Sequence, residues 1–392
     1  MRMKPAFLLI ALFACFPPTL PASDSEALTF HSSFENGRLY RAGEIRVVEL
    51  KGDYRQMGRQ YGSLLKEDLL ALNRKIEEVF IKKMKMSPTR MAAIAGAVYD
   101  RYPQRYKEIL HGMAETSGLG RDGIILLNAV EWFPKINHLF YGRCSGAAAW
   151  GPYSPDGDVV FGRNNDDDIL YRDFARHMVV AVFKPGDGSI PTALVNYAGV
   201  IYNATGINAE GLFIELNSGP WMGFSLERTS IFTTLFSYLQ EYRDIPQLDR
   251  AMRSTLVDIS AIINVADKKR ACSYECSLWD TRRRDQDDEG FLAAANAFLL
   301  PGWNLSSVDP SIEPDKSGQR QGNLVTLGAR HKGTFTPEVM MKVLDVPLEK
   351  GGATVPETIY QVVAAPKDLK MWIKVPGFEE WREIPLGPLF GK

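Results

Sequence analysis

The residues with the clearest chemical potential lie in one segment, from Tyr141 to Asp168. Cys144 lies near its start, a Pro-Asp-Gly turn signal follows at 155–157, and a short apolar run leads to Arg163 and Asp166. This pattern predicts a β-hairpin whose first strand begins at Cys144 and whose second strand returns Arg163 and Asp166 beside it. A thiol is a strong nucleophile only as thiolate, so it needs a base or a cationic neighbour. The hairpin would supply that cation.

The same segment resembles the N-terminal-nucleophile (Ntn) hydrolases of the choloylglycine hydrolase and isopenicillin N acyltransferase type. The shared pattern is a cysteine followed by small residues, then Asp156-Gly157, then Gly162 to Asp166. The stretch from Gly52 to Gly62 also resembles the start of isopenicillin N acyltransferase-like precursors. The resemblance implies that a precursor cuts itself at Arg143–Cys144 and that the freed α-amine becomes the base for its own thiol. An ordinary α-amine pKa of about 7.7–8.0 suits that role.

The resemblance also gives candidate roles to residues outside the hairpin. Asn217, after a predicted strand at Leu212–Leu216, would help to hold the oxyanion, and an ordinary turn asparagine is the alternative. Asn296 would bind substrate or hold the site together, although the family's Thr and His beside it are missing here; a solvated edge asparagine is the alternative. Arg320, in the stretch 317–320, would stabilise charge near the nucleophile, unless it is a surface arginine in a polar loop. Arg163 and Asp166 would position the Cys144 amine and thiol.

The elements that must position these residues predict an α+β fold. Residues 23–143 are expected to be mainly helical after one strand at Ile45–Leu50, and to become the α chain of the processed protein. Residues 144–392 are strand-rich, with two helices between two groups of strands, which is typical of a layered α+β domain. The resemblance implies the four-layer αββα sandwich of the Ntn family. In the helical part, Gly58 and Gly62 would let another helix approach closely.

Periodicity and turn residues give the approximate bounds of these elements. Helices are predicted at 57–72, Pro88–Asp100, Arg105–Glu115, Ile231–Tyr242 and Ile245–Ser254. Strands are predicted at Val159–Phe161, Met178–Phe183, Thr192–Tyr197, Val200–Tyr202, Leu212–Leu216, Ala261–Ala266, Cys272–Leu278, Thr358–Ala364, Met371–Val375 and Trp381–Ile384.

The N-terminus resembles a secretory signal peptide over residues 1–22. Arg2 and Lys4 precede an apolar run, Ala6–Phe16, that is too short to span a bilayer as a helix. We therefore expect a secreted or periplasmic protein. A lipoprotein signal, with Cys15 as the anchored residue, is the alternative.

The remaining cysteines single out Cys144. Cys272 and Cys276 lie four apart on a predicted strand, hence roughly 13 Å apart at about 3.3 Å per residue. That separation is beyond the reach of a disulfide, so we interpret both as small core residues. Cys144 is then unpaired in a protein expected in an oxidising compartment, which marks it as reactive.

Composition and motifs exclude several other classes of function. The net charge of −1 gives no electrostatic basis for binding nucleic acid. No phosphate loop or dinucleotide fingerprint is present, so no cofactor is expected. The acidic run from Asp166 to Asp168 would not converge on a metal ion, because successive residues on a strand point to opposite faces.

We therefore expect a self-processing N-terminal-cysteine amidase that hydrolyses linear C–N amide bonds of N-acylated small molecules. With an amine acceptor in place of water it would be an acyltransferase. Two alternatives remain: a histidine-assisted thiol peptidase, for which His177 and His331 lie downstream of Cys144, and an unprocessed, non-catalytic binding protein with the same fold. The aromatic residues around the nucleophile fit an apolar acyl pocket and a core equally well: Trp132, Tyr141, Trp150, Tyr153 and Trp221.

Overall fold

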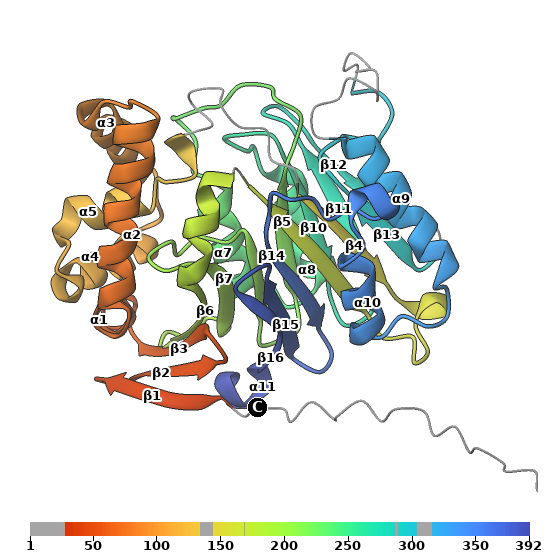
Figure 1. Cartoon of the computed structure of the whole chain (residues 1–392), viewed down its shortest axis with the longest axis horizontal. Helices are drawn as coiled ribbons and strands as arrows, with labels where there is room; N and C mark the ends of the chain where they lie inside the picture. Colours follow the sequence, from red (N-terminus) through yellow and green to blue (C-terminus); the bar gives the residue numbers. More distant parts are fainter. Residues whose placement is uncertain (1–27, 134–143, 168, 287–288, 304–315) are drawn as a thin grey trace, which may run out of the picture.

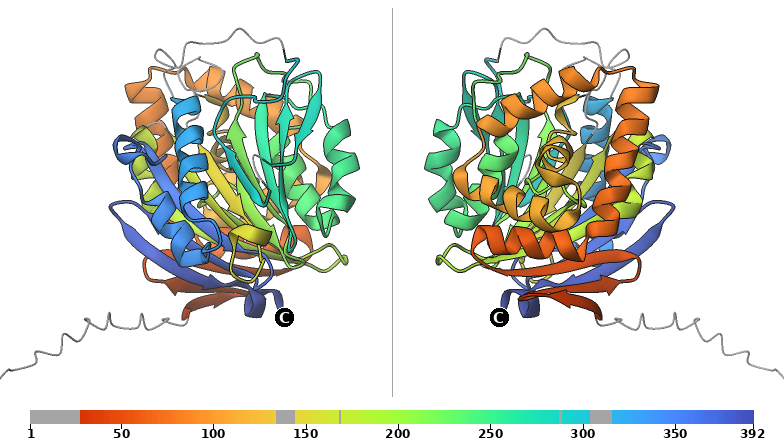
Figure 2. Two further views of the ribbon diagram at one scale, coloured as in Figure 1. Left: turned by 90° about the vertical axis from the view of Figure 1, so that its right-hand side faces the viewer. Right: turned by 90° about the vertical axis from the view of Figure 1, so that its left-hand side faces the viewer.

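The computed structural model describes residues 28–133, 144–167, 169–286, 289–303 and 316–392. Two β-sheets lie face to face, and helices cover their outer sides (Figures 1 and 2). The predicted signal peptide with Cys15, the residues from 134 to Arg143, and Asp168 lie outside the described residues. Among the described residues, no helix combines the length and apolar character needed to cross a membrane.

The larger sheet contains strands from both parts of the chain. Its order is β1 (Thr29–Phe34), β2 (Gly37–Ala42), β3 (Ile45–Gly52), β6 (Met178–Pro185), β7 (Thr192–Tyr197), β8 (Thr205–Asn208), β9 (Phe213–Ser218), β10 (Ala261–Ala266), β11 (Ala271–Cys276) and β12 (Thr281–Arg284). Neighbours are antiparallel except β3 and β6, which run parallel with Val47 opposite Val180. This parallel pair joins the N-terminal segment to the strands that follow Cys144.

The smaller sheet carries the predicted hairpin. Its order is β13 (Phe291–Ala294), β4 (Ser145–Ala149), β5 (Val160–Asp166), β14 (Thr358–Ala365), β15 (Lys370–Val375) and β16 (Glu379–Pro385), with all neighbours antiparallel. The two sheets face each other, since the rings of Phe161 on β5 and Phe213 on β9 lie 4.9 Å apart. The space between the sheets is thus part of the hydrophobic core.

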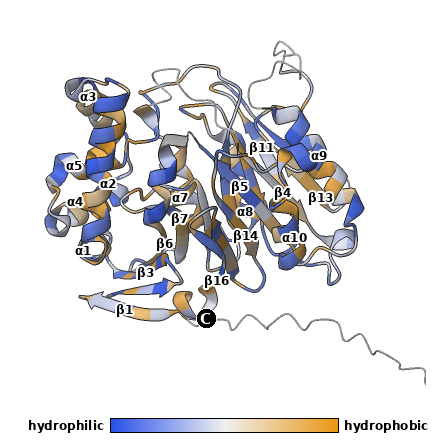
Figure 3. Ribbon diagram, viewed as in Figure 1, coloured by the Kyte–Doolittle hydropathy of each residue, from blue (hydrophilic) through white to orange (hydrophobic). Residues whose placement is uncertain are grey.

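Helices complete the layers on both sides. α7 (Ile231–Glu241) and α8 (Ile245–Ser254) pack on the larger sheet, whereas α9 (Ser317–Arg330) and α10 (Pro337–Leu344) pack on the smaller one. Figure 3 shows hydrophilic residues on the outward sides of α9 and α10. The result is the predicted α+β arrangement of helix, sheet, sheet and helix layers. The other α-helices of the described ranges are α1 (Tyr54–Leu64), α2 (Lys66–Ile76), α3 (Pro88–Asp100), α4 (Gln104–Ser117), α5 (Gly120–Leu127) and α11 (Leu386–Phe390).

Two sequence predictions about strands are wrong. The N-terminal segment has three strands instead of one, because β1 and β2 extend the edge beyond β3. The stretch 200–202, predicted as a strand, is irregular. The buried Asn128 side chain explains this, since it donates to the Gly199 carbonyl at 2.7 Å and accepts from the Ile201 amide at 3.2 Å. These backbone groups therefore bond to a side chain and not to a neighbouring strand.

Two other features confirm their predictions. A Cβ atom on Gly58 would lie 2.0 Å from the Ile109 carbonyl oxygen, and one on Gly62 would lie 2.6 Å from the Met113 carbonyl oxygen, so both glycines allow α1 to pack closely on α4. Cys272 and Cys276 are buried, unbridged residues of β11.

Candidate active site

The predicted hairpin is present and brings its residues together. Cys144 directly precedes β4, and Gly146 of β4 pairs with Arg163 of β5. Arg163 Nη2 consequently lies 3.6 Å from the Cys144 sulfur. Small residues after Cys144 are needed here, because a Cβ atom on Gly146 would lie 2.8 Å from a Glu215 carboxylate oxygen.

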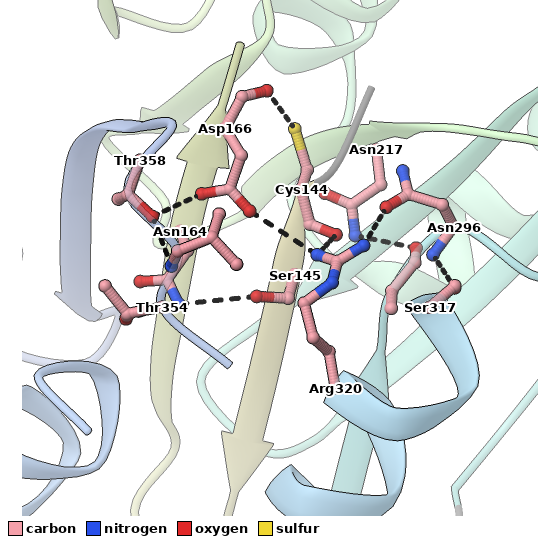
Figure 4. A network of polar contacts seen from close by, with 12 residues as sticks. Cys144, Ser145, Asn164, Asp166, Asn217, Asn296, Ser317, Arg320, Thr354 and Thr358 are labelled. Carbon is pink, nitrogen blue, oxygen red and sulfur yellow. Dashed lines mark hydrogen bonds and ion pairs between the residues drawn. The ribbon is translucent and has the colours of Figure 1, made fainter. Parts of the chain in front are cut away.

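Alternation along β5 sends its polar side chains to opposite sides of the sheet. Phe161, Arg163 and Asn165 belong to one side, which faces the larger sheet, as the contact of Phe161 with Phe213 shows. Asp166 belongs to the other side and contacts Arg320 of the α9 helix. The end of β5 therefore holds a cation on one side of Cys144 and a carboxylate on the other, as Figure 4 illustrates for the carboxylate side.

Arg163 is held by a residue that the sequence analysis missed. Its Nη1 donates to the carboxylate of Glu215 on β9 and to the Ala204 carbonyl, the latter at 2.9 Å. Glu215 is fully buried and also accepts from Asn264 Nδ2 at 2.5 Å. The sequence does contain a signal for Glu215. Glu215 shares one face of its strand with Phe213 and Asn217. A charged residue on a buried face is costly unless it is paired, which indicates a partner for Glu215.

Asp166 lies in a buried cluster with a hydroxyl and a cation. Its carboxylate accepts from the Thr358 hydroxyl at 2.6 Å and lies 3.4 Å from Arg320 Nη1. Burial raises the pKa of this carboxyl to about 7, although the positive charge of Arg320 and the Thr358 hydrogen bond act in the opposite direction. Asp166 is thus poised to change its protonation state near neutral pH.

The Cys144 thiol is buried among polar groups. Its sulfur lies 3.7 Å from the Asp166 carbonyl oxygen and 3.9 Å from Asn165 Oδ1. Burial raises the pKa of the Cys144 thiol to about 11, and the charge of Arg163 only partly opposes this. The thiol is therefore neutral at physiological pH in this arrangement, and attack on a carbonyl requires a nearby proton acceptor.

The histidines of the described chain do not supply that acceptor. His177 Nδ1 bonds to Asp68 at 2.7 Å, and His111 Nε2 bonds to the Tyr99 hydroxyl at 2.8 Å. The His331 ring packs against Phe335. Within the described ranges no histidine bonds to Cys144, while His138 lies outside them.

The two candidate asparagines cross-link the strand ends beside Cys144. Asn217 Nδ2 donates to the Ala295 carbonyl at 3.2 Å, and Asn296 Nδ2 donates to the Ser218 carbonyl at 2.7 Å. Both side chains lie beside Cys144 in Figure 4. An amide NH₂ has two hydrogens, so each asparagine retains one donor that could serve an oxyanion. Neither is a solvated turn or edge residue, since both are buried.

Arg320 is a buried helix residue and not a surface arginine in a loop. Ser317 to Arg320 form the first turn of α9, and Arg320 is fully buried. Its Nη1 donates to the Cys144 carbonyl at 3.0 Å, and its Nη2 donates to Asn296 Oδ1 at 2.8 Å. The Ser317 hydroxyl accepts from the backbone N–H of Asn296 at 2.7 Å. The start of α9 thereby fixes both the Cys144 backbone and Asn296.

A second polar group ties the hairpin to β14. Asn164 Nδ2 donates to the Ser145 hydroxyl at 3.3 Å and to the Thr354 hydroxyl at 3.1 Å, and Gln361 Nε2 donates to Asn164 Oδ1 at 2.9 Å (Figure 4). These contacts set the positions of β5 and β14 relative to the start of β4, next to Cys144. No group of acidic, histidine or cysteine side chains in the described ranges has the arrangement of a metal site.

The comparisons with known proteins give matches at the level of structure alone. No family model and no curated protein matches the chain. An N-acylethanolamine-hydrolyzing acid amidase ortholog from Caenorhabditis elegans is similar with a TM-score of 0.44 and 17% identity, over 57% of this chain and 93% of that one. A conjugated bile acid hydrolase variant from Clostridium perfringens has a TM-score of 0.45 and 13% identity, over 64% and 95%.

Penicillin V acylase from Agrobacterium tumefaciens has a TM-score of 0.43 and 10% identity, over 62% of this chain and 86% of that one. These solved structures are Ntn hydrolases of the choloylglycine hydrolase type, the family that the sequence motifs resemble.

Proposed function

We propose that this protein is a self-processing Ntn amidase that uses Cys144 to hydrolyse linear amide bonds of N-acylated small molecules. The observation that carries the proposal is the set of groups around one buried thiol. Arg163 Nη2 lies 3.6 Å from the sulfur, Arg320 Nη1 binds the Cys144 carbonyl at 3.0 Å, and two asparagine amides lie beside it. This set suits a thiol attack on a carbonyl, with donors for the resulting oxyanion.

Self-processing would begin with attack of the Cys144 thiol on the carbonyl of Arg143. The peptide C–N bond breaks as the thioester forms, and the proton from the thiol passes to the departing α-amine of Cys144. Water then hydrolyses the thioester, which releases the N-terminal chain as a carboxylic acid and leaves Cys144 with a free α-amine. The scissile bond joins a residue outside the described ranges to Cys144, so this step rests on sequence resemblance and on the Cys144 surroundings.

In turnover the freed α-amine would accept the thiol proton. The thiolate, stabilised by Arg163, attacks the amide carbonyl, and the oxyanion receives hydrogen bonds from Asn217 and a backbone N–H. The ammonium group then protonates the leaving amine as the C–N bond breaks. The amine next activates a water molecule that hydrolyses the thioester. An amine in place of this water would give acyl transfer.

The other residues act through these groups. Asp166 faces Arg320 and Thr358, and we assign it to holding the α-amine in its catalytic orientation. Asn296 and Arg320 form one hydrogen-bonded unit that fixes the Cys144 carbonyl. A secreted or periplasmic location belongs to the proposal and rests on the signal-like residues 1–22.

The histidine-assisted peptidase is the weaker candidate, because each of the two proposed bases has other partners. His177 pairs with Asp68, and His331 packs against Phe335. The non-catalytic alternative leaves unexplained why a buried ion pair, Arg163–Glu215, lies directly beside a thiol.

The test is a Cys144→Ala variant compared with the wild type. A denaturing gel of the wild type should show pieces of about 13–14 and 27–28 kDa, at about 110 Da per residue after signal removal. Cys144→Ala should remain one chain and hydrolyse no acyl anilide, since the nucleophile of both reactions is absent. Cys144→Ser should process slowly and lose most turnover, because a hydroxyl is a weaker nucleophile near neutral pH. A normally cut Cys144→Ala chain, found by mass spectrometry, would refute self-processing.

A further inference from the structure

Another buried carboxylate holds the chain segment that follows Asn296. Glu275 on β11 is 1% exposed and accepts from the Leu299 amide at 2.6 Å, the Leu300 amide at 3.1 Å and the Trp303 indole nitrogen at 2.6 Å. A buried carboxylate is costly unless donors satisfy it. Its hydrogen-bond donors belong to one short segment, residues 298–303, which the carboxylate therefore fixes on the sheet, and Arg284 Nε of β12 lies 3.9 Å away as an ion-pair partner.

The fixed segment presents two packed aromatic rings. The ring centroids of Phe298 and Trp303 lie 4.7 Å apart. The guanidinium group of Arg282 lies 4.0 Å from the Trp303 ring, and its Nη1 donates to the Pro301 carbonyl at 3.2 Å. The Trp303 ring is thus held by the Glu275 carboxylate and the Arg282 guanidinium, and Phe298 packs against it.

Phe298 lies next to the strand end that carries the candidate oxyanion donor Asn217. Phe298 follows Asn296 by two residues, and a Cβ atom on Gly219 would lie 3.1 Å from the Phe298 ring. Gly219 directly follows β9, whose last residues include Asn217, and Gly219 has no side chain to displace the ring. Phe298, with Trp303 packed against it, therefore lies next to the end of β9, and Leu299 beside it is 39% exposed.

We propose that Phe298 and Trp303 form the wall of a subsite for an apolar acyl group, and that Glu275 is the positioning residue for this wall. The inference rests on the proposed amidase function. The acyl group stays attached to the carbonyl carbon through both chemical steps, so a fixed wall next to the site of attack can hold it throughout. The rings offer apolar surface, and burial of an acyl chain against them would supply binding energy.

The test compares two substrates with one leaving group, N-decanoyl and N-acetyl p-nitroanilide. Trp303→Ala should lower kcat/KM for the decanoyl substrate about tenfold, the usual effect of removing a central aromatic contact, and leave the acetyl substrate within about threefold. Trp279→Ala is the matched control, because Trp279 is a 63% exposed tryptophan in the turn between β11 and β12. Equal losses on both substrates, or equal effects of the two variants, would overturn the subsite.

A binding measurement separates this inference from the proposed function. Calorimetric titration of decanoate into the wild type and both variants should show about tenfold weaker binding in Trp303→Ala only. Decanoate binding that depends on Trp303, without hydrolysis of either anilide, would support the subsite and refute the amidase. Hydrolysis of both anilides with decanoate affinity independent of Trp303, or no decanoate binding by the wild type, would refute the subsite.

The positioning role of Glu275 is tested by the preference between the two substrates, because general destabilisation would affect both substrates equally. Trp303→Phe keeps an aromatic ring but removes the indole N–H that donates to Glu275. Glu275→Gln keeps the size of the side chain but removes its negative charge. Both should reduce the decanoyl-to-acetyl ratio of kcat/KM without changing kcat for the acetyl substrate by more than about threefold. A fall in acetyl kcat that matches the decanoyl fall would show that Glu275 supports the fold and not the wall.

Discussion

At the scale of single residues, burial and charge compete at Cys144. The thiol is 6% exposed, and burial outweighs the nearby Arg163 so that the pKa rises to about 11. A cation alone thus does not produce a thiolate here. In the proposed mechanism the missing acceptor is the α-amine of Cys144, which exists only after cleavage. The nucleophile would then become efficient only once the chain has been cut.

Asn217 is the residue whose predicted role is most directly testable. Its Nδ2 already donates to the Ala295 carbonyl, so one hydrogen remains for an oxyanion. Asn217→Ala should lower kcat by about 10²–10³ with a smaller change in KM, because the lost bond would form mainly in the transition state. Steady-state kinetics on processed, folded protein give the answer.

The matched variant is Asn217→Asp, which should be at least as harmful because a carboxylate would repel the oxyanion. If Asn217→Ala is folded, processed and within a few-fold of the wild type, Asn217 only links β9 to the Ala295 carbonyl.

Glu215 should be required for stability as well as for the site. Glu215→Ala would leave the guanidinium of Arg163 buried without its carboxylate, which typically costs about 3–5 kcal/mol of unfolding free energy. Urea denaturation in the Cys144→Ala background, where the chain should stay in one piece, measures this effect. Asp158→Ala, which removes a solvent-exposed pair with Lys367, is the control and should change little. Equal stability of the two variants would mean that another group balances Arg163.

The sequence predicted the neighbours of Cys144 within the hairpin better than those outside it. Cys144, Arg163 and Asp166 lie close together in the chain, so one hairpin sufficed to place them. Glu215 could not be placed, because its partner Arg163 is on the facing sheet and no local pattern reports a contact between sheets. Arg320 looked like a loop residue, since the polar stretch before it hides the start of α9.

At the scale of elements, prediction was right where the pattern is local. The hairpin of β4 and β5 follows from a turn signal between short apolar runs, and the helices over Ile231 and Ile245 follow from spacing. The stretch 200–202 failed because Asn128, far away in sequence, takes its backbone hydrogen bonds. The apolar residues 200–202 are buried, as strand residues would be. The backbone around them bonds to the Asn128 side chain and not to a neighbouring strand.

The contact between α1 and α4 gives an element-scale prediction. A methyl group at Gly58 would meet the Ile109 carbonyl oxygen at 2.0 Å, and one at Gly112 would meet the Arg55 carbonyl oxygen at 2.1 Å. Neither backbone can yield without moving a helix. Gly58→Ala should therefore lower the unfolding free energy by about 1–3 kcal/mol, the usual cost of overpacking, as measured by urea denaturation in the Cys144→Ala background.

Gly96 provides the control on a neighbouring helix. It lies within α3, and a Cβ atom there would have nothing within 4 Å. Gly96→Ala should be neutral or stabilise by up to about 1 kcal/mol, because alanine is the better helix former. If both alanine variants are equally stable, close packing of α1 on α4 is not what requires Gly58.

At the scale of the whole molecule, the N-terminal segment is part of the sandwich and not an addition to it. β3 pairs with β6 along its length, and β3 residues such as Val47 and Val48 are fully buried. α1 covers β3 and also contacts β6. A cut at Arg143–Cys144 would therefore break one covalent bond while leaving the sheet and the core that join the two parts.

Processed wild-type protein should consequently elute from a native gel-filtration column as one species, at the volume of uncut Cys144→Ala. The two fragments should separate only in denaturant. Residues 144–392 produced alone should aggregate, because the loss of β3 would expose β6 as a long apolar sheet edge. Separate elution of the native fragments, or a soluble and folded 144–392 fragment, would show that the β3–β6 pairing does not hold the molecule together.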